Sequence, residues 1–261
     1  NGATLDAGND IAMNAAIAAG NGSLVATAAD AMTSSGAGVL TSNDSIILEA
    51  TATSINLNGT VTATGAGVVT LTAGTSIDTN GAIDGDLGAV TMTAQGGNVQ
   101  VDGTVDGEGV TLTSDTDDVI VNAAVDAQNL ALDINANDNI TTTATLDAGT
   151  TIDMDATTGK IEVGAAVNAG DDITMNANTD IMQVGIAATI TTPTDVFMTA
   201  TTGRISRNAA SRVNAVNLTA TAATGINLWT DVATADLSTT SAVANSNISI
   251  IQQNDINLLD V

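Results

Sequence analysis

Four aspartates stand at equivalent points of a repeating sequence and could bind a cation together. Each follows the single apolar residue of a short segment; they are Asp84, Asp106, Asp126 and Asp147, with Asn168 next in the series. If the segments are stacked strands, these carboxylates lie about 4.8 Å apart and repel one another. A hard divalent cation such as Ca²⁺ takes oxygen ligands from several carboxylates. The alternative is a solvated acidic edge, which the sequence favours because it has no EF-hand loop.

Closely spaced acids elsewhere could serve catalysis. Asp153 with Asp155, and Asp171 with Asp172, have the pairing that glycoside hydrolysis uses. However, the chain has no His, Tyr or Cys and a single Lys, Lys160. Nucleophile pairs of the Ser-His or Cys-His type are therefore excluded. We predict that the chain is not an enzyme and needs no cofactor.

A further acidic group occupies one loop. Asp115, Asp117 and Asp118 lie within four residues, at a point where the apolar pattern is interrupted. Asp is typical of turns because its side chain bonds nearby backbone. Turn formation is therefore the favoured interpretation, with metal binding as the alternative.

Pairs of threonines could form a flat array of the kind that some ice-binding solenoids present. Thr70-x-Thr72, Thr91-x-Thr93 and Thr111-x-Thr113 would stack as two columns. Further along, the equivalent pairs are expected to be Ala131/Asp133, Asp153/Asp155 and Thr174/Asn176, which interrupt the array with charge. The high β propensity of Thr accounts equally for the pairs, and ice binding is kept as an alternative.

Basic and aromatic residues gather late in the sequence. Arg204, Arg207 and Arg212 fall in one repeat that has no acid, whereas 25 of the 29 acidic residues precede residue 200. Phe197 and Trp229 are expected to face outward nearby. Arg with exposed aromatics is typical of interaction hot spots. Two interpretations stay open: self-association with the acidic part of another copy, lateral or end to end, and a local groove that packs against the same chain.

All these residues belong to a repeat of about 21 residues. In its clearest copies an apolar-Thr-apolar-Thr run is followed by a second apolar pair, an Asn/Asp-Gly corner and a third apolar residue. The middle apolar residue of the run serves as a marker. We expect the marker at Leu5, Leu24, Leu48, Leu71, Met92, Leu112, Leu132, Met154, Met175, Met198, Leu218, Leu237 and Leu258.

Each repeat predicts three short strands, because apolar and polar residues alternate with period 2. Corners such as Asn58-Gly59 and Asn80-Gly81 are expected to adopt positive φ. The Ala-rich segment 12–19 has helical propensity but aligns with the repeat. We predict an all-β, right-handed parallel β-helix (β-solenoid) of about twelve coils, forming one domain over residues 1–261. It would be a fragment of a longer solenoid or a protomer that stacks end to end.

Composition limits the partners. The net charge of −25 excludes nucleic acid, because phosphate binding requires Lys and Arg. No segment approaches the roughly 20 apolar residues of a membrane span. With one Trp and one Phe, the core must be built from Leu, Ile, Val, Met and Ala.

The V-T-L-T-A/G…I-x-x-N-G-x-I-x-A-G pattern resembles the filamentous-haemagglutinin-like adhesins of bacteria, most clearly over residues 48–237. The resemblance implies a secreted protein at the bacterial cell surface, with a host or cell-surface glycan or protein as its partner. The secretion module of that family is not recognisable. We therefore expect a non-catalytic structural segment, either a rigid adhesin stalk or a filament-forming subunit. A ligand-binding solenoid face, for glycan or ice, is the alternative.

Overall fold

The computed structural model describes residues 2–186, 188–240 and 247–260, which form strands and turns without a helix. The chain divides into two compact units, Asn1–Leu130 and Ala131–Val261. Each is a parallel β-solenoid, and the repeat makes about 12 turns roughly 21 residues apart, which confirms the predicted fold class. The right-handed winding stays a prediction. Among the described residues, no helix has the length and apolar character of a membrane span.

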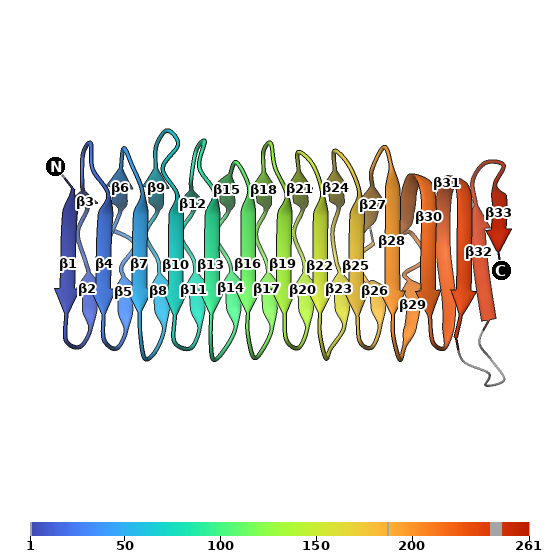
Figure 1. Ribbon diagram of the computed structural model, residues 1–261, viewed down its shortest axis with the longest axis horizontal. Coiled ribbons are helices and arrows are strands. Elements are labelled where there is room, and N and C mark those ends of the chain that lie inside the picture. The colour runs from blue at the N-terminus through green and yellow to red at the C-terminus, as the bar shows by residue number, and fades with distance from the viewer. Residues whose placement is uncertain (1, 187, 241–246, 261) are drawn as a thin grey trace. The chain divides into compact units, whose positions relative to one another are not determined.

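Unit 1 is built from three series of parallel strands, which Figure 1 shows in blue to green. Its first series is β1 (Ala3–Ala7), β4 (Leu24–Ala28), β7 (Ile46–Ala50), β10 (Val69–Ala73), β13 (Val90–Ala94) and β16 (Val110–Ser114). Its second is β2 (Ile11–Met13), β5 (Met32–Ser34), β8 (Ile55–Leu57), β11 (Ile77–Thr79), β14 (Val99–Val101) and β17 (Val119–Val121). Its third is β3 (Ile17–Ala18), β6 (Leu40–Ser42), β9 (Val61–Ala63), β12 (Ile83–Asp84), β15 (Val105–Gly107) and β18 (Val125–Ala127).

Unit 2 begins with the same three series. The first is β19 (Leu132–Ala136), β22 (Ile152–Ala156), β25 (Ile173–Ala177) and β28 (Asp195–Ala200). The second is β20 (Ile140–Thr142), β23 (Ile161–Val163), β26 (Ile181–Gln183) and β29 (Arg204–Arg207). The third is β21 (Leu146–Ala148), β24 (Val167–Ala169) and β27 (Thr189–Thr191).

The series then merge into long strands in the rest of unit 2. β30 (Arg212–Ala222) pairs with the third-series strand β27 and then with the first-series strand β28. β31 (Gly225–Thr239) pairs with β29 and then follows β30 along its length. β32 (Asn247–Gln252) and β33 (Asn257–Asp260) pair with the two ends of β31. The corners between the three sides are thus bends within continuous strands.

The core lies inside the coils and consists of aliphatic columns. Leu48, Leu71, Met92 and Leu112 are each 0% exposed and pair in register from coil to coil. Burying an aliphatic side chain stabilises a fold by about 1.5–3 kcal/mol. A short coil therefore depends on its neighbours, which cover the apolar edges that it cannot cover alone.

Four of the predicted marker positions are wrong by two residues. Leu5 and Leu48 both pair with Ala26 rather than Leu24. In unit 2 the marker is Ile134 rather than Leu132, Ala220 rather than Leu218, and Leu258 pairs with Ala235 rather than Leu237. Side chains two apart on a strand face the same way, so the pattern does not distinguish these registers. The structure places Ala, the smaller residue, at two of these marker positions.

The backbones of neighbouring coils approach each other closely at the corners, and this explains the glycines there. The prediction that these glycines adopt positive φ is wrong. Among described residues, positive φ occurs at Gly20, Gly65, Gly225 and Asp86 but not at Gly59 or Gly81. A Cβ built on Gly81 would lie 2.1 Å from the carbonyl oxygen of Gly59. Stacked corners therefore bring backbone against backbone, and a side chain has no room.

Candidate functional site

Three aspartates of the predicted column stack in unit 1, and amide groups donate hydrogen bonds to two of them. Asp84 pairs with Asp106, which pairs with Asp126, all on the outer side of unit 1. Asp84 Oδ1 accepts a 2.8 Å hydrogen bond from the Asp86 N–H, and the side-chain amide of Gln128 donates to Asp106. In unit 2, Asp147 accepts a 2.7 Å bond from Asn168. These oxygens could ligate Ca²⁺ only in competition with those donors, and the cation ladder stays a prediction.

The loop acids lie in the bend between β16 and β17, and both the turn and the metal interpretation of their side chains stay predictions. The Asp117 N–H donates to Ser114 Oγ at 3.1 Å, and the Asp118 N–H donates to Asn98 Oδ1 at 3.2 Å. Asp115 and Asp117 are exposed. These backbone bonds satisfy polar groups that the corner removes from the strand ladder.

Unit 1 also carries an amide–carboxylate ladder that the sequence analysis missed. Asp78 accepts hydrogen bonds from Asn56 at 3.3 Å and Asn80 at 3.2 Å. Asp102 accepts from Gln100 at 2.6 Å and Asn122 at 2.8 Å. Partial burial, and then the charge of Asp102, raise the pKa of Asp78. The signal in the sequence is the recurrence of an amide or acid in the middle of β8, β11 and β14 and at the corner that follows each of them.

Asp153 and Asp155 lie on one strand of unit 2, β22, and the carboxylate that stacks on Asp153 comes from the adjacent coil. Asp153 is exposed and pairs with Asp133, whose pKa is raised by partial burial and then by the Asp153 charge. Asp155 instead lies between Asn135 and Asn176. A shallow hollow of about 280 Å³ holds Asp155 as its single carboxylate. Glycoside hydrolysis needs two carboxyl groups flanking one substrate, and this hollow provides one.

The remaining acid pair belongs to a corner. Asp171 is exposed, whereas Asp172 is half-buried and its Oδ1 accepts a 3.1 Å bond from the Asp195 N–H. Asp172 thus satisfies a backbone donor of the neighbouring coil, as capping side chains do.

The threonine pairs stack as predicted over three coils of unit 1. Thr70, Thr91 and Thr111 form one column, and Thr72, Thr93 and Thr113 form the other. The preceding coil places Ile47 and Glu49 in these positions. In unit 2 the outward pair of β19 is Asp133/Asn135, which corrects the expected Ala131/Asp133. Ice binding stays an untested alternative.

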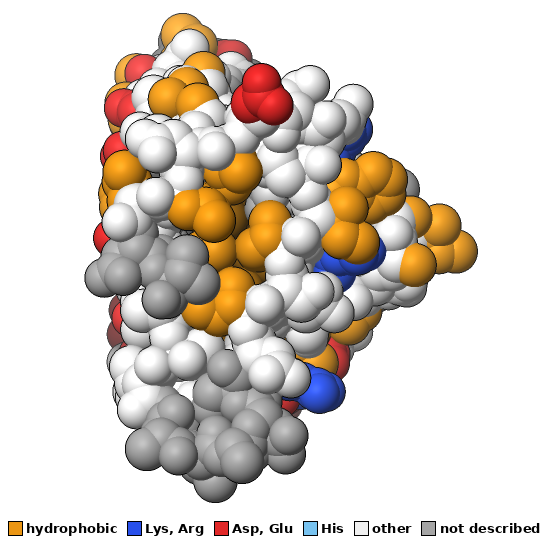
Figure 2. All heavy atoms as spheres, turned by 90° about the vertical axis from the view of Figure 1, so that its right-hand side faces the viewer, with side chains coloured by type: hydrophobic (Ala, Val, Ile, Leu, Met, Phe, Trp, Pro, Cys, Tyr) orange, Lys and Arg blue, Asp and Glu red, His pale blue; other side chains and the backbone are white. Residues whose placement is uncertain are grey.

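The structure brings together part of the predicted Arg and aromatic group. The guanidinium carbons of Arg207 and Arg212 lie 5.9 and 5.7 Å from the centre of the Trp229 ring, within cation–π range. Arg207 also donates to the carbonyl oxygens of Asn208 and Ala209. Figure 2 shows basic side chains beside hydrophobic ones along one side of this end of unit 2. Both arginines therefore have partners within their own unit, in keeping with the local-groove interpretation.

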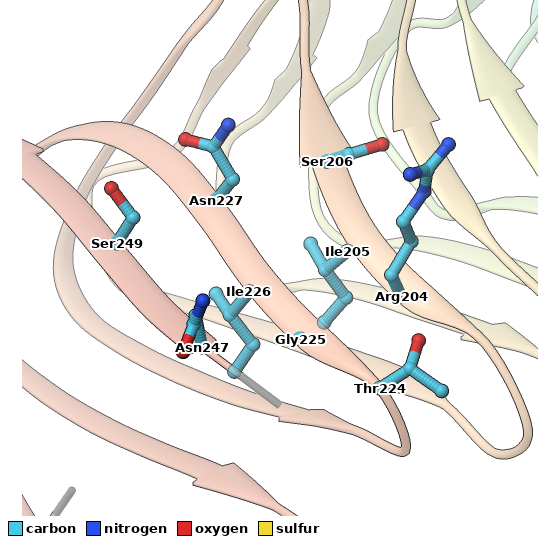
Figure 3. Close-up of a pocket in the computed structure, with 9 residues that line it drawn as sticks. All are labelled: Arg204, Ile205, Ser206, Thr224, Gly225, Ile226, Asn227, Asn247 and Ser249. Atoms are coloured by element: carbon cyan, nitrogen blue, oxygen red, sulfur yellow. The ribbon is translucent and has the colours of Figure 1, made fainter. Parts of the chain in front are cut away.

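Phe197 and Arg204 complete the predicted group. Phe197 is 37% exposed on β28 of the first series, between Thr174 and Thr219. Arg204 is exposed on β29 and lines a hollow of about 310 Å³ (Figure 3). The hollow is lined by Arg204, Ile205, Ser206, Thr224, Gly225, Ile226, Asn227, Asn247 and Ser249.

Among the described residues, two buried polar atoms on a pair of strand partners have no hydrogen bond. Gln183 is 2% exposed, and its amide donates to the carbonyl oxygens of Ala188 and Arg212. Its Oε1, and the Nε of the paired residue Arg207, are buried without a hydrogen bond in the described part of the chain. An acceptor and a donor on neighbouring strands are the chemistry that a buried water satisfies.

Comparison of the chain with protein-family models, with curated proteins and with solved structures gave no match. The chain is a β-helical repeat protein by its structure.

Proposed function

We propose that this chain is a non-catalytic structural segment of a bacterial extracellular surface protein, a rigid stalk of the filamentous-haemagglutinin-like adhesin type. The observation that supports this role is the uninterrupted stacking of short coils in unit 1. Apolar side chains with no exposure fill the inside of each coil, and parallel ladders join each strand to its neighbours. A stack of this kind keeps its two ends apart and needs no catalytic or binding site to do so.

A reach assay tests the stalk role. The chain is fused between a bacterial membrane anchor and a fluorescent head, and a Gly/Ser linker of 261 residues replaces it in the matched control. Stacked coils should hold the head at one narrow range of distances from the anchor, because parallel strands fix the spacing of neighbouring coils. The flexible linker should give a broad distribution of distances. Energy transfer to a membrane dye measures both. Equal, broad distributions for the two fusions would refute the stalk.

The filament-forming version of the proposal involves self-association through Phe197 and Arg204. Arg207 and Arg212 are poorer candidates, because Trp229 already binds them. Sedimentation velocity tests this version: assembly that Arg204→Glu abolishes and Lys160→Glu leaves intact would support it. A monomer at all concentrations would exclude this version while leaving the stalk role standing.

A further inference from the structure

The hollow on unit 2 differs chemically from the rest of this acidic chain. The described residues that line it carry one guanidinium, two amides and three hydroxyls, and none of them is acidic. In Figure 3, Arg204 and Ser206 project from one strand, Asn227 from the next, and Asn247 and Ser249 from the third. The outer surface of β29, β31 and β32 therefore combines a cation with hydrogen-bonding groups of both polarities.

Gly225 creates the space. It pairs with Arg204 on one side and with Asn247 on the other, so one column reads Arg, Gly, Asn across three coils. Because Gly225 has no side chain, a depression is left between the side chains of Arg204 and Asn247. A Cβ at Gly225 would lie 3.1 Å from the Asn247 carbonyl oxygen, and its φ of 156° favours glycine.

The guanidinium of Arg204 is available to a ligand. Within the described ranges, the only ion pair joins Lys160 to Glu162 at 2.8 Å. The Asp180 side chain does bind Arg204, but it accepts a 2.8 Å hydrogen bond from the backbone N–H of Arg204. Arg207 and Arg212 instead lie against Trp229.

We propose that this hollow binds a small hydroxylated carboxylate, the chemistry of an acidic sugar. Arg binds carboxylates through two parallel N–H···O bonds. Amide and hydroxyl groups from Asn227, Ser206 and Ser249 would meet the hydroxyls of such a ligand. A volume of about 310 Å³ is at the lower end for ligand pockets, which suits one sugar ring.

Charge favours a small acid over the acidic surface of a second copy. A second copy brings a net charge of −25 toward a chain of the same charge. A single acidic sugar brings one negative charge, so it meets far less long-range repulsion. The inference does not depend on the stalk role.

The test uses the full chain with sodium glucuronate, glucose and sodium acetate as probes, and calorimetry or ligand-observed NMR as readout. Glucuronate should bind at least about tenfold more tightly than glucose, because a charge-assisted hydrogen bond is worth about 1.5–3 kcal/mol. Glucuronate should also bind more tightly than acetate, which lacks hydroxyls. Arg204→Gln should reduce glucuronate binding to the level of glucose. Lys160→Gln, which removes a cation elsewhere in unit 2, should leave it unchanged.

A second variant guards against misfolding of the first. Asn227 is exposed, so Asn227→Ala should keep the fold by circular dichroism and weaken glucuronate binding several-fold. Equal binding of glucuronate and glucose, or no effect of Arg204→Gln, would overturn the proposal. Acetate binding as tightly as glucuronate would overturn the sugar assignment. Loss of self-association in Arg204→Gln without any glucuronate binding would assign the surface to a second copy instead.

Discussion

The coils of unit 1 from β10 to β18 and the strands of unit 2 from β28 to β33 show two ways of using one repeat. In the first region, small outward residues such as Thr70 and Thr91 repeat from coil to coil, and the strands are two to five residues long. In the second, Phe197 stands at such an outward position, Arg204 is exposed, and β31 extends over 15 residues. Regular stacking leaves a surface of uniform columns, whereas the departures create local contacts and a hollow.

The difference shows that inward residues serve stability, whereas outward residues and corners are the positions where recognition can arise. Most inward positions remain aliphatic in both regions, for example Leu71 in β10 and Leu228 in β31, both 0% exposed. Only the outward positions and corners change. Solenoid coils interact mainly with their neighbours, so a local change outside costs little elsewhere.

The largest expected effect is in the core of the regular region. Leu71→Ala should destabilise the fold by about 2–5 kcal/mol, because neighbouring coils cannot collapse into the cavity. Ile251→Ala, on β32 where the side chain is 51% exposed, should cost less than about 1 kcal/mol. Urea unfolding followed by circular dichroism measures both. Similar losses would show that burial inside the coils is not what makes an apolar residue stabilise this fold.

A corner glycine gives the next effect. Gly81→Ala should cost about 1–3 kcal/mol, because its Cβ meets the Gly59 carbonyl oxygen and the coils must separate. Gly36→Ala is the matched control, since nothing lies within 4 Å of a Cβ built there. If both variants unfold at the wild-type urea concentration, close approach is not what selects glycine.

In the irregular region, the Arg–Trp contacts should be measurable. A double-mutant cycle of Trp229→Ala with Arg212→Met should give a coupling free energy of about 0.5–1 kcal/mol, typical of an accessible cation–π pair. Thermal unfolding of the four proteins supplies the values. A coupling of zero would mean that the ring and the guanidinium are neighbours without attraction.

The smallest effect concerns charge on unit 2. The raised pKa of Asp133 means that its ionisation opposes folding, so this penalty is absent below its ordinary pKa of 3.8, grows as pH rises from there to the folded value, and is constant above it. Asp133→Asn should therefore stabilise the protein at pH 7 by a few tenths of a kcal/mol, and by nothing at pH 3.

Asp155→Asn is the control for that measurement, because it removes the same charge from a position flanked by Asn135 and Asn176. Its stabilisation at pH 7 should be smaller. Equal effects of the two variants would point to net charge rather than to the Asp133–Asp153 pair.

The sequence by itself determined the repeat, the parallel solenoid and the faces of most residues, because period-2 alternation identifies what points inward. It predicted the stacked aspartates and threonines of unit 1 for the same reason. The tertiary structure decided the register where two inward residues compete, as at Leu24 and Ala26.

Stacking also decided which residues of different coils meet. The hollow exists because Gly225 falls between Arg204 and Asn247, which are 43 positions apart in the numbering of the chain. The contact of Trp229 with Arg207 and Arg212 likewise depends on where the long strands bend. A local pattern shows the direction of a side chain along its own strand, but its neighbours across the sheet follow from the length of every corner between them.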